Sequence, residues 1–151
     1  MRGRKAQKIM IKNEKQYKIS KSKLKDFEKS LKVCQEGSYP DALIYKAMKD
    51  SLKSQMDDLK REIREYEKLK NQKVPRIKIN SFDQFPEALI RSRISHGYTQ
   101  KQFAVKLKMP EQQIQRYEAE NYRAVSFETL MKIAKVLNID LEKETSVKIG
   151  Y

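Results

Sequence analysis

Five hydrogen-bonding side chains are concentrated in the short segment 111–116 of this sequence. They are Glu111, Gln112, Gln113, Gln115 and Arg116. A glutamine amide can pair in bidentate fashion with adenine and an arginine with guanine, and a glutamate can accept a hydrogen bond from cytosine. If the segment is a helix whose Ile114 and Tyr117 face a core, these polar side chains are exposed together. Their types then suit the reading of base edges in the major groove of DNA.

Short helices around a tight turn are predicted to position this segment. Apolar residues recur at the three-to-four spacing that gives a helix one buried face. The residues that follow this pattern are Ile90, Ile94, Phe103, Ala104, Leu107, Ile114 and Tyr117. Gly97 ends the first helix, and Thr99 is a good N-cap for the second. Ser81 or Asp83 opens the region, and Ser126 caps a later helix, 127–137, whose apolar side chains complete the core.

The stretch from Ile90 to Ile139 resembles the helix-turn-helix of the Cro and lambda-repressor type, also called the xenobiotic-response-element type. The resemblance is carried by the combination TQKQFA, QQIQRYE and LMKIAKVL. It implies an all-α domain that binds double-stranded DNA, with the helix at 111–118 in the major groove. In that family Glu111, Gln112 and Arg116 match positions that read bases, and Gln113 and Gln115 lie nearer the backbone. We count Gln113 among the base-reading residues and Gln115 among those that contact phosphate.

The same resemblance implies contacts to the DNA backbone at the start of the preceding helix. Gln100, directly after the cap Thr99, matches a position that touches phosphate beside the helix N-terminus. Asn121, Tyr122 and Arg123 follow the recognition helix and are either further phosphate contacts or solvated loop residues.

Two more features follow from comparison with this family. Arg93 and Glu118 match a structural ion pair that joins the first helix to the end of the recognition helix. Lys108 stands where the family most often has glycine, and Pro110 where it most often has a Ser or Thr cap. A non-glycine residue with positive φ costs about 1 kcal/mol, so the turn departs from the family pattern.

The positive charge of the chain lies mainly outside this region. The net charge is +14, which favours a polyanionic partner. Residues 81–151 hold 11 Lys and Arg against 9 Asp and Glu, whereas residues 1–80 hold 23 against 11. Residues 1–32 alone contain 12 basic and 3 acidic residues. We therefore expect the N-terminal half to supply bulk attraction to a polyanion.

The N-terminal half is predicted to be an antiparallel helical hairpin. We expect a basic arm at 1–19, a hairpin at 20–70, a linker at 71–80 that adds at most a short strand, the helix-turn-helix domain at 81–140 and a tail at 141–151. Ser20 is the expected cap of the first helix, which runs to about residue 36, and the second begins near Pro40. Leu43, Ile44, Met48 and Leu69 lie beside the apolar stripe that the two helices share. Either a second copy of the hairpin covers them, or the C-terminal domain of the same chain does.

Other classes of protein find little support in the sequence. The single Cys34 cannot form an intramolecular disulfide and is best explained as a small apolar helix residue. His96 has no partner at metal-ligand spacing, and there is no nucleophile motif or glycine-rich phosphate loop. We therefore expect no catalysis, metal or cofactor. The lack of a signal peptide or membrane-spanning segment leads us to expect a cytoplasmic protein, and the resemblance to bacterial regulators implies a bacterial one.

Three functions remain open at this point. The first is a homodimeric repressor of a palindromic operator, since one reading helix recognises only a few base pairs. The second is an antitoxin or accessory subunit of the HigA type, whose basic N-terminal half binds an acidic protein partner, such as a toxin, and whose DNA binding regulates its own operon. Residues 11–70 loosely resemble the N-terminal extension of bacterial regulators. Non-specific binding through the basic arm is a third possibility.

Overall fold

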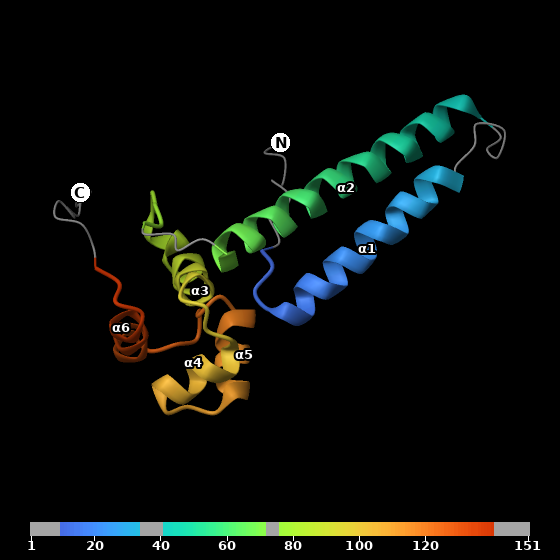
Figure 1. The fold of residues 1–151 in the computed structure, drawn as a ribbon. Helices are drawn as coiled ribbons and strands as arrows, with labels where there is room; N and C mark the ends of the chain where they lie inside the picture. The colour runs from blue at the N-terminus through green and yellow to red at the C-terminus, as the bar shows by residue number, and fades with distance from the viewer. Residues whose placement is uncertain (1–9, 34–40, 72–75, 141–151) are drawn as a thin grey trace, which may run out of the picture. The chain divides into compact units, whose positions relative to one another are not determined.

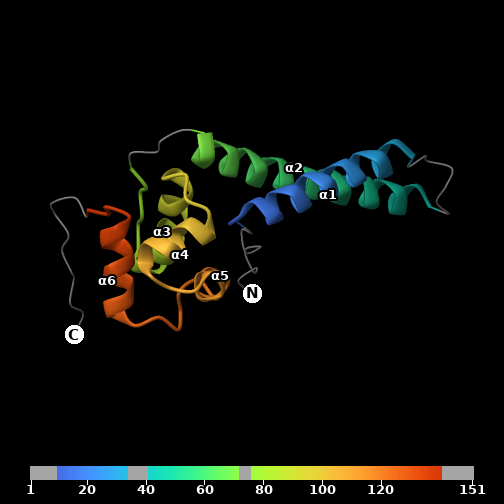
Figure 2. The same cartoon turned by 60° about the horizontal axis from the view of Figure 1, so that its bottom comes forward.

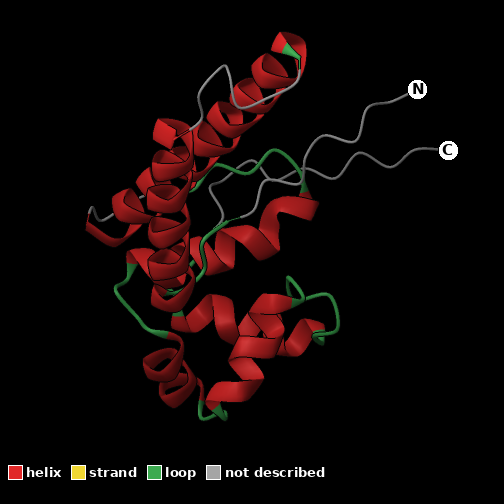
Figure 3. Cartoon of the chain, turned by 90° about the vertical axis from the view of Figure 1, so that its right-hand side faces the viewer, coloured by secondary structure: helices red, strands yellow, loops and turns green. Residues whose placement is uncertain are grey.

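Helices form the regular structure throughout the residues that can be described. The computed structural model describes residues 10–33, 41–71 and 76–140, and these ranges contain helices and connecting turns without a strand (Figure 3). The chain divides into two compact units, Met1–Gln72 and Lys73–Tyr151. This confirms the predicted all-α class. No helix in the described ranges is both long and apolar enough to cross a membrane.

The first unit is a pair of long helices that lie side by side and antiparallel, α1 (Glu14–Val33) and α2 (Ala42–Asn71) (Figures 1 and 2). Their facing side chains follow the three-to-four spacing predicted from the sequence. Met56, Ile63 and Tyr66 of α2 are buried, while α1 contributes only half-buried residues to this seam. The predicted turn between the helices lies at 34–40, outside the described residues.

The first helix begins earlier than the sequence predicted. It starts at Glu14, so residues 14–19 belong to the helix and not to the expected arm at 1–19. The expected cap at Ser20 is wrong for the same reason. Asn13 provides the cap, because its Oδ1 accepts a hydrogen bond of 2.9 Å from the backbone N–H of Gln16. The Gln16 side chain in turn accepts from the backbone N–H of Lys12 at 2.8 Å. This reciprocal arrangement satisfies amides at the helix start, so Ser20 is simply a residue within α1.

Polar contacts between side chains of α1 and α2, two of them made by tyrosine hydroxyls, fix the register at one end of the hairpin. The rings of Tyr17 and Tyr66 lie 5.1 Å apart. The hydroxyl of Tyr17 donates to Glu67 at 2.5 Å, and that of Tyr66 donates to Glu14 at 3.4 Å. Lys70 forms an ion pair with Glu14 at 2.7 Å. Each of these contacts joins α1 to α2, so a shift of one helix along the other would break several at once.

The ion pair gives the hairpin a predictable pH dependence. The hydrogen bond from Lys70 lowers the pKa of Glu14 below its ordinary value, and Glu14 raises the pKa of Lys70. The Glu14 contribution is therefore present above the unfolded pKa near 4.5 and is lost as the pH falls through the lower folded value. The Lys70 contribution is lost only as the pH rises above about 10.5.

We expect Lys70→Met to lower the free energy of unfolding at neutral pH by less than about 1 kcal/mol, because both partners are half-exposed. Chemical denaturation at pH 7 and at pH 3 measures the difference between variant and parent. The difference should shrink at the lower pH, because the contribution of the ion pair is lost as the pH falls from 4.5 through the lowered pKa of Glu14. Lys68→Met, which changes a nearby exposed lysine, is the control. A difference of equal size at both pH values would contradict this assignment.

The second unit contains four α-helices preceded by one turn of 3-10 helix, within residues 76–140. These elements are η2 (Phe82–Gln84), α3 (Phe85–Ser95), α4 (Gln100–Leu107), α5 (Glu111–Ala119) and α6 (Phe127–Val136). Thr99 and Ser126 are N-caps whose side chains accept backbone hydrogen bonds, as the sequence indicated. Ser81, one of the two residues expected to open the region, is at the N-cap position of η2, but its side chain makes no cap hydrogen bond. Residues 76–79 form no strand, and the predicted tail at 141–151 lies outside the described residues.

The core of this unit is built mostly from the apolar positions that the helical spacing identified, together with Leu89, which that pattern did not include. At most 1% of each of its largest side chains is exposed, and these are Leu89, Ile90, Phe103, Leu107, Ile114, Ile133 and Leu137. Tyr117 and Leu130 are only half-buried. The last helix ends one residue earlier than predicted, at Val136, and Asn138 beyond it has a positive φ of 48°. The buried faces of α4 and α5 fix which side chains of α5 remain outside.

Candidate nucleic-acid interface

The exposed face of α5 carries the polar side chains identified in the sequence. Ile114 and Glu118 are fully buried, which fixes the rotation of the helix. Gln112, Gln115 and Arg116 are exposed as a result, and Glu111 and Gln113 are half-exposed. Positions three and four apart lie on one side of a helix, so Gln112 is adjacent to both Gln115 and Arg116. The structure therefore brings the predicted base-reading residues together on one surface.

Two pairs of these side chains are hydrogen-bonded to each other along the helix. The Gln115 amide donates to the Glu111 carboxylate at 3.1 Å, and the Arg116 guanidinium donates to the Gln113 amide oxygen at 3.1 Å. Such exposed pairs contribute only about 0.2–0.5 kcal/mol. Because the pairs are this weak, the side chains can exchange them for contacts with bases at small cost.

The turn before α5 adopts the conformation that the sequence made unfavourable. Lys108 has φ 56° and ψ 46°, the left-handed region that favours glycine, at a cost of about 1 kcal/mol. The N–H of Lys108 donates to Val105 and that of Met109 to Ala104, which closes the end of α4. Pro110 is the N-cap of α5 and its side chain makes no cap hydrogen bond. The fixed φ of proline instead presets the entry into the helix.

The start of α4 is capped from both sides. The Thr99 side chain accepts from the N–H of Gln102 at 3.1 Å, and the Gln102 side chain accepts from the N–H of Thr99 at 3.0 Å. The neighbouring Gln100 was predicted to contact phosphate. Its amide donates to Glu118 at 2.8 Å, and its contact with phosphate stays a prediction. Gln100 thus links the start of α4 to the end of α5, a connection that its sequence position alone did not reveal.

A buried ion-pair network, formed by Arg93, Gln100 and Glu118, joins three helices beneath the exposed face. The side chains of Arg93 and Glu118 are 3% and 0% exposed. Arg93 forms a bidentate pair with Glu118, with distances of 2.5 and 2.9 Å, and its remaining nitrogen donates to the Tyr98 carbonyl at 2.6 Å. The Glu118 carboxylate thus receives donors from α3 and α4. Because buried charges require full pairing, the network permits few orientations of α5.

The segment after α5 differs from its predicted role at one residue. Tyr122 is only 3% exposed, and its ring lies 6.2 Å from that of Tyr117. Burial raises the pKa of its phenol well above the ordinary value, and the Glu118 charge acts in the same direction. The predicted phosphate contact of the Tyr122 side chain is therefore wrong, because this side chain is buried in the domain core. Arg123 is exposed and Asn121 is half-buried, so both remain near enough to the surface to serve that role.

Comparison with known proteins gives one match, which covers this region. Residues 89–143 match the family model described as Helix-turn-helix. This segment is a helix-turn-helix domain of the Cro and lambda-repressor type. No curated protein and no solved structure matched the chain. The matched segment stops short of α1 and α2, so the looser resemblance of residues 11–70 to bacterial regulators gains no support from it.

The helix-turn-helix domain makes the chain a DNA-binding transcription regulator. In such a domain the second helix of the motif enters the major groove, and residues of its first two turns reach base edges. Here that helix is α5, and the polar residues on its exposed face are those whose hydrogen-bonding groups match bases. The domain itself contributes little net charge, because 11 basic and 9 acidic residues lie at 81–151.

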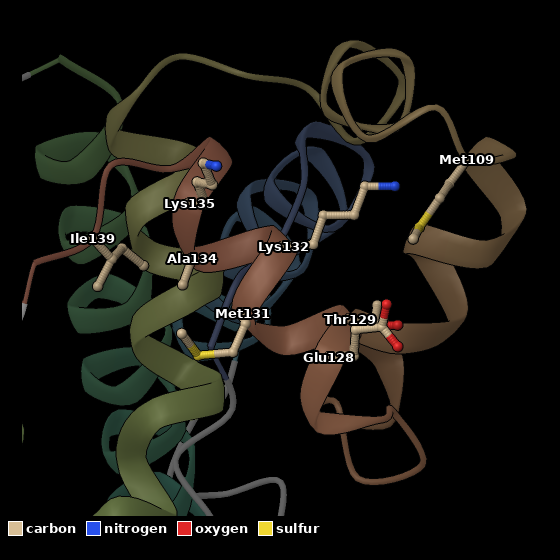
Figure 4. Close-up of a pocket in the computed structure, with 8 residues that line it drawn as sticks. All are labelled: Met109, Glu128, Thr129, Met131, Lys132, Ala134, Lys135 and Ile139. Carbon is tan, nitrogen blue, oxygen red and sulfur yellow. The ribbon is translucent and has the colours of Figure 1, made fainter.

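An open pocket on the helix-turn-helix domain lies apart from this face. It encloses about 740 Å³, and its lining consists of Met109, Glu128, Thr129, Met131, Lys132, Ala134, Lys135 and Ile139 (Figure 4). These residues belong to the turn before α5, to α6 and to the segment after it. None of the eight comes from α5, so the pocket does not contribute to base reading. No group of three potential metal-ligating side chains occurs in the described ranges.

Proposed function

We propose that this regulator is a sequence-specific repressor that binds an inverted-repeat operator as a homodimer, without a catalytic step. The observation that carries the proposal is the exposed polar face of α5 above the buried network of Arg93, Gln100 and Glu118. A reading helix held at a fixed angle loses little conformational entropy on binding. Glu111, Gln112, Gln113 and Arg116 are assigned to bases, and Thr99, Gln100, Gln115, Asn121 and Arg123 to the backbone or its support.

The homodimer follows from the small size of the reading surface and from the hairpin. A single recognition helix contacts only a few base pairs, and two-fold symmetric dimers place two such helices about 34 Å apart. Near the start of α2, Leu43 is 72% exposed, Ile44 47% and Met48 42%. These apolar side chains offer a contact surface for the corresponding helix of a second copy.

Selection of bound duplexes from a random pool by the full chain tests the proposal. We expect one shared sequence arranged as an inverted repeat, with half-site centres about one helical turn of DNA apart. Light scattering should give twice the chain mass of 17.9 kDa. Leu43→Asp combined with Ile44→Asp should yield a monomer. Val105→Asp in α4, where the side chain is equally exposed at 72%, is the matched control and should leave the dimer intact.

The same exposed apolar residues favour a second candidate function. In an antitoxin or accessory subunit, they would contact an acidic protein partner, and DNA binding would serve autoregulation. A chain that is monomeric alone, and whose Leu43→Asp and Ile44→Asp substitutions leave DNA selection unchanged, favours this second function over the repressor. A dimer that the two substitutions dissociate, with weaker operator binding, favours the repressor.

A further inference from the structure

Five lysines form a continuous stripe along α1 that the helix-turn-helix domain does not account for. The lysine stripe consists of Lys18, Lys21, Lys25, Lys29 and Lys32. All five are exposed. With 3.6 residues per turn, their positions fall within an arc of about 80° on the helix. Lys18 and Lys32 are fourteen positions apart, which corresponds to about 21 Å at 1.5 Å per residue.

The lysine stripe works against the stability of the helix that carries it. Like charges three and four residues apart repel one another on a helix. Opposite charges on the partner helix would relieve this repulsion, but the ion pairs formed among residues 10–33, 41–71 and 76–140 leave the five lysines out. Lys21 contacts the hydroxyl and ring of Tyr17. Two acidic residues of α1 border the stripe, namely Glu28 and Glu14, whose carboxylate is paired with Lys70 and also interacts with Lys18. The arrangement therefore suits a ligand that supplies negative charges in a row.

The spacing of the lysine stripe matches a nucleic-acid backbone better than other anionic surfaces. Duplex DNA presents a regular line of phosphates, and lysine binds phosphate as a flexible point charge. A helix that binds an anionic membrane also inserts an exposed apolar face. On α1 the exposed large apolar side chains are Ile19 and Val33, which lie fourteen residues apart and outside the arc of the stripe. The other apolar side chains of α1, at Leu24, Phe27 and Leu31, are half-buried.

We propose that the lysine stripe of α1 is a second, sequence-independent DNA-binding surface that contacts the phosphate backbone of duplex DNA. This proposal goes beyond the repressor proposal. It requires that the chain binds duplex DNA, but not that it recognises a specific operator. The helix-turn-helix domain distinguishes sequences but is nearly neutral, and the stripe supplies electrostatic affinity that is the same for every sequence. Because both units belong to one chain, binding by either raises the effective concentration of DNA at the other.

The salt dependence of binding to a short duplex of mixed sequence tests this proposal on the full chain. Lys25→Gln, Lys29→Gln and Lys32→Gln are introduced together, since glutamine keeps the helical preference and removes three charges. Each lost phosphate contact should reduce the slope of log affinity against log salt by about 0.9, hence by about 2.7 for three. Between about 50 and 200 mM salt, the ratio of parent to variant affinity should then fall by about fortyfold.

Two further triple variants separate this effect from bulk charge and from misfolding. Lys15→Gln, Lys23→Gln and Lys68→Gln remove three exposed charges of the same unit outside the stripe, and should change the slope by less than about 1. Arginine at positions 25, 29 and 32 should preserve the parental slope. Equal slopes for the stripe variant and the control glutamine variant would overturn the proposal. An unchanged slope in both variants would also overturn it, and would favour an acidic protein as the ligand of the stripe.

The outcome is independent of the operator. Selection from a random pool can return no shared sequence while the stripe variant still shows a smaller slope of log affinity against log salt. In that case the repressor proposal fails and the stripe proposal stands. If selection succeeds and the slope is unchanged, the stripe proposal fails alone.

Discussion

Glu118→Gln is expected to lower the free energy of unfolding of the helix-turn-helix domain by about 3–5 kcal/mol, because it leaves the buried guanidinium of Arg93 without its counter-charge. Glutamine has nearly the same shape as glutamate, so the loss reports charge and hydrogen bonding rather than a cavity. The carboxylate accepts bonds from two nitrogens of Arg93 and from Gln100, and an amide oxygen cannot replace all three. Chemical denaturation of the full chain, followed by circular dichroism, measures the change.

Glu120→Gln is the matched control, since it removes the same charge two residues later from an exposed side chain. It should change the free energy of unfolding by less than about 0.5 kcal/mol. Arg93→Met combined with Glu118→Leu should recover most of the stability, because replacing both buried charges removes the unpaired group. A loss below about 1 kcal/mol for Glu118→Gln would show that the ion-pair network does not fix α5.

Gln112→Ala and Arg116→Ala are expected to weaken binding to the selected operator and to relax its sequence preference. Both side chains are exposed on α5, so their removal should leave the fold intact. Each base contact is worth about 1–3 kcal/mol. This corresponds to about 5- to 150-fold in Kd for each residue. Fluorescence anisotropy with the operator and with duplexes altered at single base pairs measures both affinity and preference.

Lys135→Ala on α6 is the control for the charge lost with Arg116, since it is also exposed and lies outside α5. It should leave the order of preference among the altered duplexes unchanged. Affinity lost to the same extent for every duplex would assign Gln112 and Arg116 to the backbone instead of to bases. An unchanged order of preference in the two α5 variants would therefore contradict the assignment of α5 as the reading helix.

Variants of the buried ion pair and variants of the exposed face of α5 affect binding for different reasons. A change at Glu118 or Arg93 is expected to weaken binding by disturbing the orientation of α5, since both side chains are buried. A change at Gln112 or Arg116 acts at the surface. Measuring the free energy of unfolding beside the operator affinity distinguishes the two causes for each variant.

The helix-turn-helix domain was predictable because its signals are local. Caps such as Thr99 and Ser126 have specific partners a few residues along the chain, and the three-to-four apolar spacing identifies the buried faces. Ile114 marks the inner side of α5 and thereby indicates that Gln112 and Arg116 lie outside. The start of α1 was misplaced because Asn13 and Ser20 both satisfy the preference for an N-cap. The hydrogen bonds from the Gln16 N–H to the Asn13 side chain and from the Lys12 N–H to the Gln16 side chain place the helix start at Asn13.

The sequence by itself determined the all-α class, the amphipathic helices and the polar residue types on α5, because each depends on neighbours within a few positions. Only the tertiary structure decided the roles of Gln100 and Tyr122. Both are polar residues beside helix ends, where sequence patterns indicate surface contacts, yet Gln100 bonds to Glu118 and Tyr122 is buried. The deciding partners are separated in sequence, as Glu118 is from Arg93 and Gln100. Packing of α3, α4 and α5 brings these groups together in a buried site, where each charge must be paired.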